Sequence, residues 1–345
     1  MKCTIKDIAK ELNLSRNTVA KALKGSSEVS PKTQELVHAK AKEMHYISHT
    51  EISISPAGQK PANKGSILFL TRTYANDSEF WSSVLKGIEA ILSAANYHLV
   101  LGIMSDTDLK TLQFPGSIYD PSIKGIIIVE ICYESVCKAL LQFHLPIVTV
   151  DMPKNYHDLM GKFDIITMEN KINIYNITNQ LLEKGAKRFG FIGDIYTSNV
   201  GRGFQERYDA LNECLKEHNL KLDQKCCLLH ETTDDFRNFG LVIEKIQQMS
   251  GLPDVFICGN DWLAIQLIYA LQFLGYKVPR DVSVTGFDNI PASERIVPAL
   301  TTISTPKEYL GIAAAKQIIE RIDHPDAPCI FAQYATELIM RGSTI

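Results

Sequence analysis

The chain has 345 residues, 45% of them hydrophobic, and a formal net charge of only −3. This length exceeds that of one small domain and suffices for two or three packed units. The eight cysteines lack the paired spacing of metal ligands, so we interpret them as reduced thiols of a cytoplasmic protein. We find no signal peptide and no apolar run of membrane-spanning length, and we expect no metal and no cofactor.

The charge is distributed unevenly along the chain. Residues 1–64 contain eleven Lys and Arg against six Asp and Glu, a local charge of +5, so the remainder carries −8. A basic head on an acidic body indicates that one end of the chain contacts DNA.

Two short helices are predicted at the start of this basic head. Thr4 and Asp7 have the spacing of a capping box, and apolar residues follow at helical spacing as far as Leu12. Ser15 is a good N-cap for a second helix, whose apolar side includes Val19.

A third helix is predicted after a second break. Gly25 ends the preceding helix, and Ser30 and Pro31 supply a cap and a first-turn proline. Three short helices with a tight turn between the first two form a helix-turn-helix unit, whose second helix enters the major groove of DNA.

From Gly65 onward, short apolar strands alternate with amphipathic helices. Continuous apolar strands separated by helices are typical of parallel sheets that are covered on both faces. There are too many strands for one compact sheet, and sheets of this kind bind ligands outside the carboxyl ends of their strands. The predicted strands are residues 67–70, 99–103, 125–129, 146–150, 189–192, 255–258 and 282–285.

The head and the body together resemble one family. Residues 4–9 and 14–21, followed by Tyr46, resemble the N-terminus of the lactose/purine-repressor (LacI/GalR) family in their order of caps, apolar and polar residues. The resemblance extends through the late segments at residues 277–288, 298–303 and 341–344.

This resemblance implies an all-α helix-turn-helix head and an α/β body like that of periplasmic binding proteins, with two parallel-sheet lobes joined by three crossing strands. Residues 1–48 would form the DNA-binding domain, 49–64 a linker, and 65–345 the effector-binding and dimerisation domain. The N-lobe would comprise about 65–160 and 290–323, and the C-lobe about 162–288 and 324–345.

The linker departs from the family pattern. Relatives usually follow the third-helix tyrosine with a hinge helix whose leucine wedges into the minor groove. Here Ser55 stands at the leucine position, Pro56 and Gly58 follow it, and Ile52 and Ile54 alternate with serines. Such alternation disfavours a helix, so we expect an extended linker without the hinge-helix motif and do not carry the wedge over.

The resemblance also implies which residues contact DNA. Arg16, Asn17 and Lys21 occupy the family's base-reading positions, where Arg and Lys can donate to guanine and Asn can pair with adenine. Each of them could instead contact phosphate, where most protein–DNA hydrogen bonds go. Phosphate contacts, several of which double as helix caps, are expected from Thr4, Ser15, Thr18, Lys24, Ser30 and Thr33.

Effector-binding positions follow from the same resemblance, most of them directly after predicted strands. Polar and charged groups of this kind, with stacking aromatics, suit a polyhydroxylated ligand. Core packing is the alternative role for the aromatics, and loop capping is the alternative for Asp261. The expected effector-binding residues are Phe80, Trp81, Asp151, Arg207, Asn260, Asp261 and Asp288.

The implied function is that of a transcription regulator, most often a repressor, that binds operator DNA as a homodimer and responds to a small molecule. A sugar or sugar derivative is favoured as effector, and a nucleobase is the second possibility. The alternative function is a solute-binding protein of the periplasmic sugar-receptor type, which would need export. An enzyme is not favoured, because we find no phosphate loop, serine-elbow motif or metal-ligand cluster. The sequence leaves the operator and the sign of regulation open.

Overall fold

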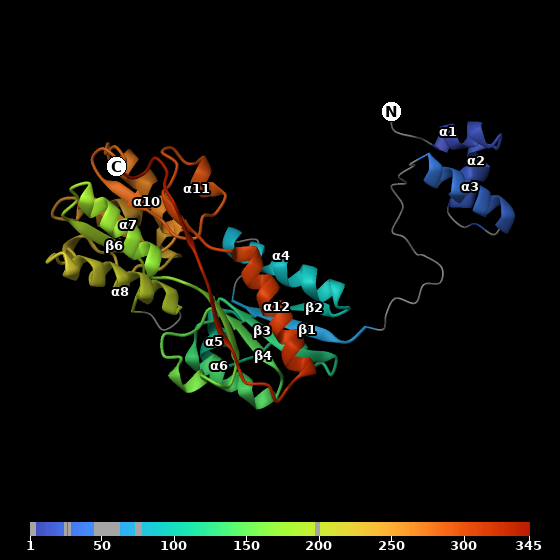
Figure 1. Cartoon of the computed structure of the whole chain (residues 1–345), viewed down its shortest axis with the longest axis horizontal. Helices are drawn as coiled ribbons and strands as arrows, with labels where there is room; N and C mark the ends of the chain where they lie inside the picture. Colours follow the sequence, from blue (N-terminus) through green and yellow to red (C-terminus); the bar gives the residue numbers. More distant parts are fainter. Residues whose placement is uncertain (1–4, 24–25, 27–28, 45–62, 73–77, 197–200) are drawn as a thin grey trace. The chain divides into compact units, whose positions relative to one another are not determined.

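The computed structural model describes residues 5–23, 26, 29–44, 63–72, 78–196 and 201–345. The chain divides into two compact units, residues 1–60 and 61–345, drawn in Figure 1. None of the described helices is long and apolar enough to cross a membrane.

The first unit contains the three predicted helices, α1 (Ile5–Glu11), α2 (Arg16–Leu23) and α3 (Pro31–Glu43). Asn13 takes a left-handed φ of 52° in the tight turn after α1, a conformation that asparagine adopts more readily than most residues. Ile8, Val19 and Val37, one from each helix, are fully buried against one another. The short helices therefore stabilise each other through a shared apolar core.

Two serines begin helices of this unit as expected. The side-chain oxygen of Ser15 accepts a hydrogen bond from the Thr18 amide at 3.0 Å, and that of Ser30 accepts from the Thr33 amide at 3.2 Å. Each cap satisfies one of the amides that a helix start leaves without a partner. Thr4, Lys24 and the residues of the predicted linker up to 62 lie outside the described residues.

The larger unit begins with a six-stranded parallel sheet in the order β10-β5-β4-β3-β1-β2. On β1, Ile67 and Phe69 face one layer of the core, whereas Leu68 and Leu70 face the other. Because successive strand side chains point to opposite faces, such a run must be covered on both sides. The strands are β1 (Ser66–Thr71), β2 (His98–Ile103), β3 (Ile123–Val129), β4 (Ile147–Val150), β5 (Asp164–Met168) and β10 (Phe331–Tyr334).

Helices cover both faces of this sheet. α4 (Glu79–Ala94) and α12 (Lys307–Asp323) pack on one face, and α5 (Asp106–Thr111) and α6 (Glu134–Leu140) pack on the other. α4 and α12 lie side by side (Figure 1). Gly311 allows this close approach, because a Cβ atom at that position would lie only 2.0 Å from the backbone oxygen of Val84.

The second lobe has a three-stranded parallel sheet, ordered β6-β7-β8, with helices packed around it. Its elements are β6 (Phe189–Ile192), β7 (Val255–Cys258), β8 (Ser283–Thr285), α7 (Ile172–Glu183), α8 (Arg202–Glu217), α9 (Phe239–Gln247), α10 (Asp261–Phe273) and α11 (Ala292–Arg295). Short 3-10 helices lie in the connections of the two lobes, at Gly116–Tyr119, Leu141–Phe143, His157–Leu159, Gln224–Cys226 and Asp235–Arg237.

Three connections join the lobes, after β5, after β9 (Thr302–Ser304) and after β10. β11 (Glu337–Ile339) pairs antiparallel with β9, and the backbone amide of Val284 in β8 donates to Ser343 at 2.9 Å. The last residues of the chain therefore return to the second lobe.

The boundaries of the lobes differ from our expectation in three places. We placed residues 290–323 in the N-lobe, but α11 and β9 belong to the second lobe, where Thr285 bridges Thr301 and Asp288 bridges Ser304, and the chain crosses to the N-lobe only after β9. We placed residues 162–288 and 324–345 in the C-lobe, but β5 pairs with β4, and β10 pairs with β5, in the sheet of the N-lobe. Both segments lead from the N-lobe sheet into a crossing connection, so the change of lobe falls after each strand and not before it.

Candidate functional site

A cavity of 540 Å³ opens between the two lobes of the larger unit. Its walls come from the loops beyond the carboxyl ends of both parallel sheets, where open α/β sheets present ligand groups. Six of the seven positions expected to contact an effector line it: Phe80, Trp81, Asp151, Arg207, Asn260 and Asp288.

Arg207 is held firmly at the base of this cavity. It lies on α8 and is only 6% exposed, and its Nε and Nη2 atoms donate to the side-chain oxygen of Asn170 at 3.1 and 2.8 Å. Its Nη1 atom donates to the backbone oxygen of Gly259 at 2.6 Å, and its guanidinium lies 3.5 Å from the ring centre of Phe287. Burial lowers the pKa of Arg207, and the negative charge of Asp288 opposes that shift; the group remains a fixed cation because arginine does not deprotonate in proteins.

Two carboxylates share the cavity with this cation. Asp151 follows β4 and Asp288 lies shortly beyond β8. Burial raises the pKa of each to about 6, because removing a carboxylate from water disfavours its charged form. At neutral pH both are mainly ionised and can accept hydrogen bonds from a ligand.

The backbone at both carboxylates is unusual. Asp151 has a φ of 72° and Asp288 a φ of 114°, values that side chains with a Cβ atom adopt rarely. The amide of Asp288 donates to the Ile303 oxygen at 2.8 Å, and the Lys307 ammonium donates to the backbone oxygen of Asp288. Strained backbone that its surroundings maintain in this way is concentrated at functional sites.

Aromatic side chains form the apolar part of the wall. Phe80 and Trp81, in the first turn of α4, meet edge to face with ring centres 4.6 Å apart. Trp262, in the first turn of α10, lines the cavity as well. The chain has only two tryptophans, and both border this cavity. A cavity with rings on its walls and polar groups at its base suits a ligand with an apolar face and a hydroxylated rim.

Sequence reasoning missed several charged residues of this cavity. Arg72 follows β1, Glu130 follows β3 and Asp194 follows β6 closely, and all three line the cavity. The rule that parallel sheets present ligand groups at their carboxyl ends would have found them.

Two further charged residues come from an irregular segment of the second lobe. A carboxylate oxygen of Asp234 lies 3.7 Å from a nitrogen of Arg72 in the N-lobe and 3.2 Å from the Nε atom of Arg237. No sequence pattern marks this segment, because it has neither strand nor helix periodicity.

Asp261 is placed differently from our expectation. Its carboxylate accepts hydrogen bonds from the Ile290 amide at 2.9 Å and from the Thr302 hydroxyl, and it does not line the cavity. Burial raises the pKa of Asp261 to about 7, and Asp288 adds to the shift. Its side chain joins α10 to the connection between the lobes, a structural role that corresponds to the loop-capping alternative. We therefore leave it out of the proposed effector site.

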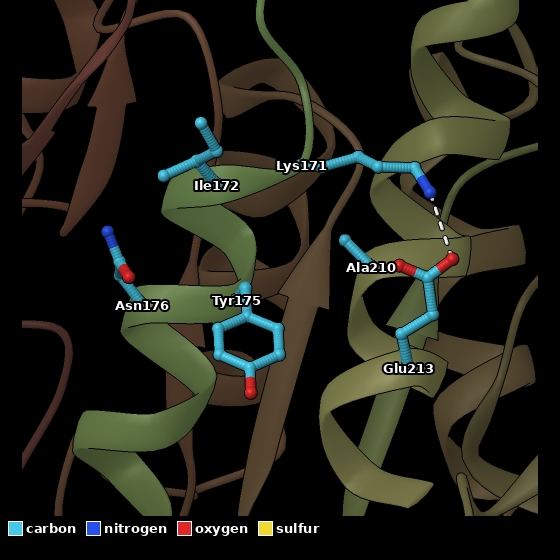
Figure 2. Close-up of a pocket in the computed structure, with 6 residues that line it drawn as sticks. All are labelled: Lys171, Ile172, Tyr175, Asn176, Ala210 and Glu213. Atoms are coloured by element: carbon cyan, nitrogen blue, oxygen red, sulfur yellow. Dashed lines mark hydrogen bonds and ion pairs between the residues drawn. The ribbon is translucent and has the colours of Figure 1, made fainter. Parts of the chain in front are cut away.

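A second, shallow groove lies between α7 and α8. Figure 2 shows Lys171 reaching across it to Glu213, with an N–O distance of 2.9 Å. None of the residues expected to bind an effector lines this groove, so the cavity between the lobes is the better candidate.

The expected DNA contacts fall on the smaller unit. Arg16 and Asn17 are exposed in the first turn of α2, and Lys21 is half-buried one turn later. The hydroxyls of Ser15 and Thr18 lie 2.8 Å apart, as do those of Ser30 and Thr33. These four residues are therefore engaged in helix starts, whereas Arg16 and Asn17 present their side chains to solvent.

Comparison with known proteins identifies both units. Residues 4–49 match the model for bacterial regulatory proteins of the lacI family, and residues 178–344 match that for a periplasmic binding protein-like domain. The chain is 26% identical to the HTH-type transcriptional repressor PurR of Klebsiella pneumoniae (strain 342), over 92% of this chain and 90% of that protein.

Solved structures share the fold over the full length. The complex of the transcriptional regulator CelR with cellobiose matches with a TM-score of 0.70 and 21% identity, over 99% of this chain and 100% of that one. The lac repressor dimer bound to operator and the anti-inducer ONPF matches with a TM-score of 0.69 and 16% identity, over 100% of both chains.

A helix-turn-helix head and a two-lobed α/β body with a cavity define the class as that of transcription regulators with an effector-binding domain. The chain belongs to the LacI family of bacterial regulatory proteins. A solute-binding protein without a transcriptional role is not favoured, because such a role leaves the helix-turn-helix head without a purpose.

Proposed function

We propose that this protein represses transcription as a homodimer on operator DNA and that a sugar-like molecule in the cavity between its lobes controls its DNA affinity. The observation that carries the proposal is the convergence of Arg207, Asp151 and Asp288 beside aromatic rings in a cavity of 540 Å³. A fixed cation and carboxylate acceptors can orient several hydroxyl groups, while rings pack against the apolar face of a sugar.

The relatives support this choice of effector and partner. The solved CelR structure holds cellobiose, and the lac repressor dimer is bound to operator. A helix-turn-helix unit contacts one half-site, so a palindromic operator requires two copies of the chain. We propose residues 1–48 as the DNA-binding domain, 49–64 as a linker, and the remainder as the effector-binding and dimerisation domain.

A ligand screen tests the effector class directly. We propose titrating the full chain with pentoses, hexoses, disaccharides and purine bases while following tryptophan fluorescence, since both tryptophans border the cavity. A saturable response to a sugar supports the proposal. A response to purine bases alone would replace the sugar with a nucleobase as the effector.

The DNA head gives a separate prediction. Arg16→Ala and Asn17→Ala should each lower discrimination between the preferred operator and variants of it by about 1–3 kcal/mol, the usual value of a bidentate base contact. Both side chains are exposed on α2. Binding-site selection followed by fluorescence anisotropy on the selected operator and its single-base variants measures this discrimination.

Lys32→Ala provides the matched control for these two variants, because Lys32 is an exposed basic residue of α3 outside the recognition helix. It should weaken binding to all sequences alike, if at all. Should the Arg16 variant return the same consensus as the parent chain, Arg16 contacts phosphate and is not a base reader.

A further inference from the structure

The cavity is acidic, and its charges restrict the effector. Among the residues that the structure describes, three guanidinium groups line it, those of Arg72, Arg207 and Arg237. Six carboxylates line it as well: Glu79, Glu130, Asp151, Asp194, Asp234 and Asp288. Two ammonium groups lie nearby, but both are engaged by backbone oxygens, Lys154 by that of Ile195 and Lys307 by those of Asp288 and Asn289. An anion that enters this space therefore meets excess negative charge, which opposes its binding.

Arg207 is poorly placed to bind an anion in spite of its charge. A guanidinium holds phosphate or carboxylate strongly when two parallel N–H groups are available to it. Here Nε and Nη2 donate to Asn170, Nη1 donates to Gly259, and one face lies on the Phe287 ring. The second N–H of Nη2 faces the sulfur of Met168 at 4.0 Å. Four of the five N–H groups are therefore engaged, so Arg207 can offer one further hydrogen bond but cannot bind an anion through two parallel N–H groups.

The other two guanidiniums converge on one carboxylate. Asp234 lies between them, 3.7 Å from Arg72 and 3.2 Å from Arg237. Arg72 belongs to the N-lobe and Arg237 to the second lobe, so without Asp234 the pair would resemble a clamp for an anion at the mouth of the cavity. The Asp234 carboxylate therefore occupies the space between the two guanidinium groups.

One carboxylate of the cavity, that of Asp288, accepts no hydrogen bond from any residue that the structure describes, and burial raises its pKa. Asp288 is half-buried, and a ligand that fills the cavity covers its carboxylate, which then needs hydrogen-bond donors in place of water. A ligand that fills the cavity must therefore present hydroxyl or amine hydrogens toward Asp288.

We infer that the effector is a hydrogen-bond donor without any anionic group, namely an unphosphorylated, non-acidic sugar or amino sugar, and that Asp234 excludes phosphorylated and acidic analogues. This inference rests on the proposed function, since it concerns the same cavity. It assigns Asp288 to recognition of donors and Asp234 to specificity, by keeping Arg72 and Arg237 from acting as an anion clamp.

Matched ligands test the inference on the full chain through tryptophan fluorescence, which reports on the cavity because both tryptophans border it. The panel pairs each neutral sugar with its amino, phosphate and uronic acid derivatives, and inorganic phosphate serves as a probe at constant ionic strength. Neutral or amino members should give saturable responses, and their anionic derivatives should bind at least about tenfold more weakly. An anionic derivative that binds as tightly as its parent, or saturable binding of phosphate, overturns the inference.

Asp234→Asn makes the test specific. Because Arg72 and Arg237 lose their shared carboxylate, this variant should acquire a saturable response to phosphate that the parent chain lacks. Asp106→Asn is the matched control, since Asp106 lies 3.9 Å from Arg72 but does not line the cavity, and it should acquire none. No gain in the Asp234 variant overturns the role assigned to Asp234. If purine bases change the fluorescence and sugars do not, the proposed sugar effector is wrong. The phosphate titrations of the parent chain and of the Asp234 variant still test whether the cavity excludes anions.

Discussion

Replacing Asp288 with asparagine should weaken binding of the effector by about 10- to 150-fold, which corresponds to the roughly 1.5–3 kcal/mol of a hydrogen bond to a charged group. The carboxylate faces the cavity without a donor from any described residue, so the ligand supplies its hydrogen bonds. Titration calorimetry or tryptophan fluorescence measures the loss. Asp326→Asn, the same change on an exposed loop, should leave the affinity unaltered. Equal affinity in the two variants would remove Asp288 from the effector site.

The same carboxylates predict how the affinity depends on pH. Burial raises the pKa of Asp151 and of Asp288 to about 6. Lowering the pH from 7 to 5 therefore protonates both groups and removes acceptors that the ligand needs, so the affinity should fall. Asp288→Asn should show a smaller fall, because Asp151 is then the only one of these two acceptors that titrates.

Stability should change in the opposite direction in the protein without ligand. In the unfolded chain these carboxyls titrate near their ordinary pKa of about 3.9. The folded protein binds the protons more tightly, so these two groups contribute to a free energy of unfolding that rises as the pH falls through about 6 toward 4. Urea denaturation at several pH values measures this trend. For the preceding prediction, an effector affinity that stays constant between pH 7 and 5 would contradict the role of the two carboxylates in binding.

Asp164→Ala should lower the free energy of unfolding by about 3–5 kcal/mol, the cost of removing one partner from a buried ion pair. Asp164 is 0% exposed at the start of β5. It accepts from Nε and Nη2 of Arg321 at 2.9 Å each and from the Ile330 amide at 2.8 Å. The substitution leaves the Arg321 cation buried without its carboxylate, and it loosens the link between β5, α12 and the approach to β10.

Urea denaturation followed by circular dichroism measures this loss. Glu308→Ala is the matched control, because Glu308 pairs with Lys86 at 2.9 Å from the same helix, α12, but both side chains are more than half exposed. Exposed pairs of this kind contribute little, so the control should unfold at nearly the parent urea concentration. Similar losses in both variants would show that burial of the Asp164–Arg321 pair is not what makes it important.

The sequence predicted four of the six strands of the first sheet, β1, β2, β3 and β4, but it did not predict β5 or β10. The apolar pattern is clearest where a strand such as β1 is buried on both faces. A run such as Ile67–Leu70 must be apolar at every position to lie between two layers of helices. β9 and β11 have three residues each, too few for a periodic pattern to show. β10 has alternately exposed and half-buried residues at the sheet edge, and it pairs with β5, which lies more than 160 residues earlier. Such long-range pairing leaves no local signal.

The candidate site was partly predictable for a related reason. Residues directly after strands, such as Asp151, lie at the carboxyl end of the sheet whatever the conformation of the following loop. Asp261 shows the limit of that rule, because Asn260 caps α10 through its side chain and the next side chain turns toward Ile290 and Thr302. Asp234 lies in an irregular segment, where only the tertiary structure brings it to Arg72.

In the proposed mechanism, occupation of the cavity between the lobes controls the affinity of the head for DNA. The most direct test measures operator affinity of the full chain with and without the sugar identified by fluorescence, and then sugar affinity with and without the operator. Each ligand should change the affinity of the other by the same factor, on the order of 5- to 150-fold, because linkage between two sites is reciprocal. Saturable sugar binding that leaves operator affinity unchanged would contradict this mechanism.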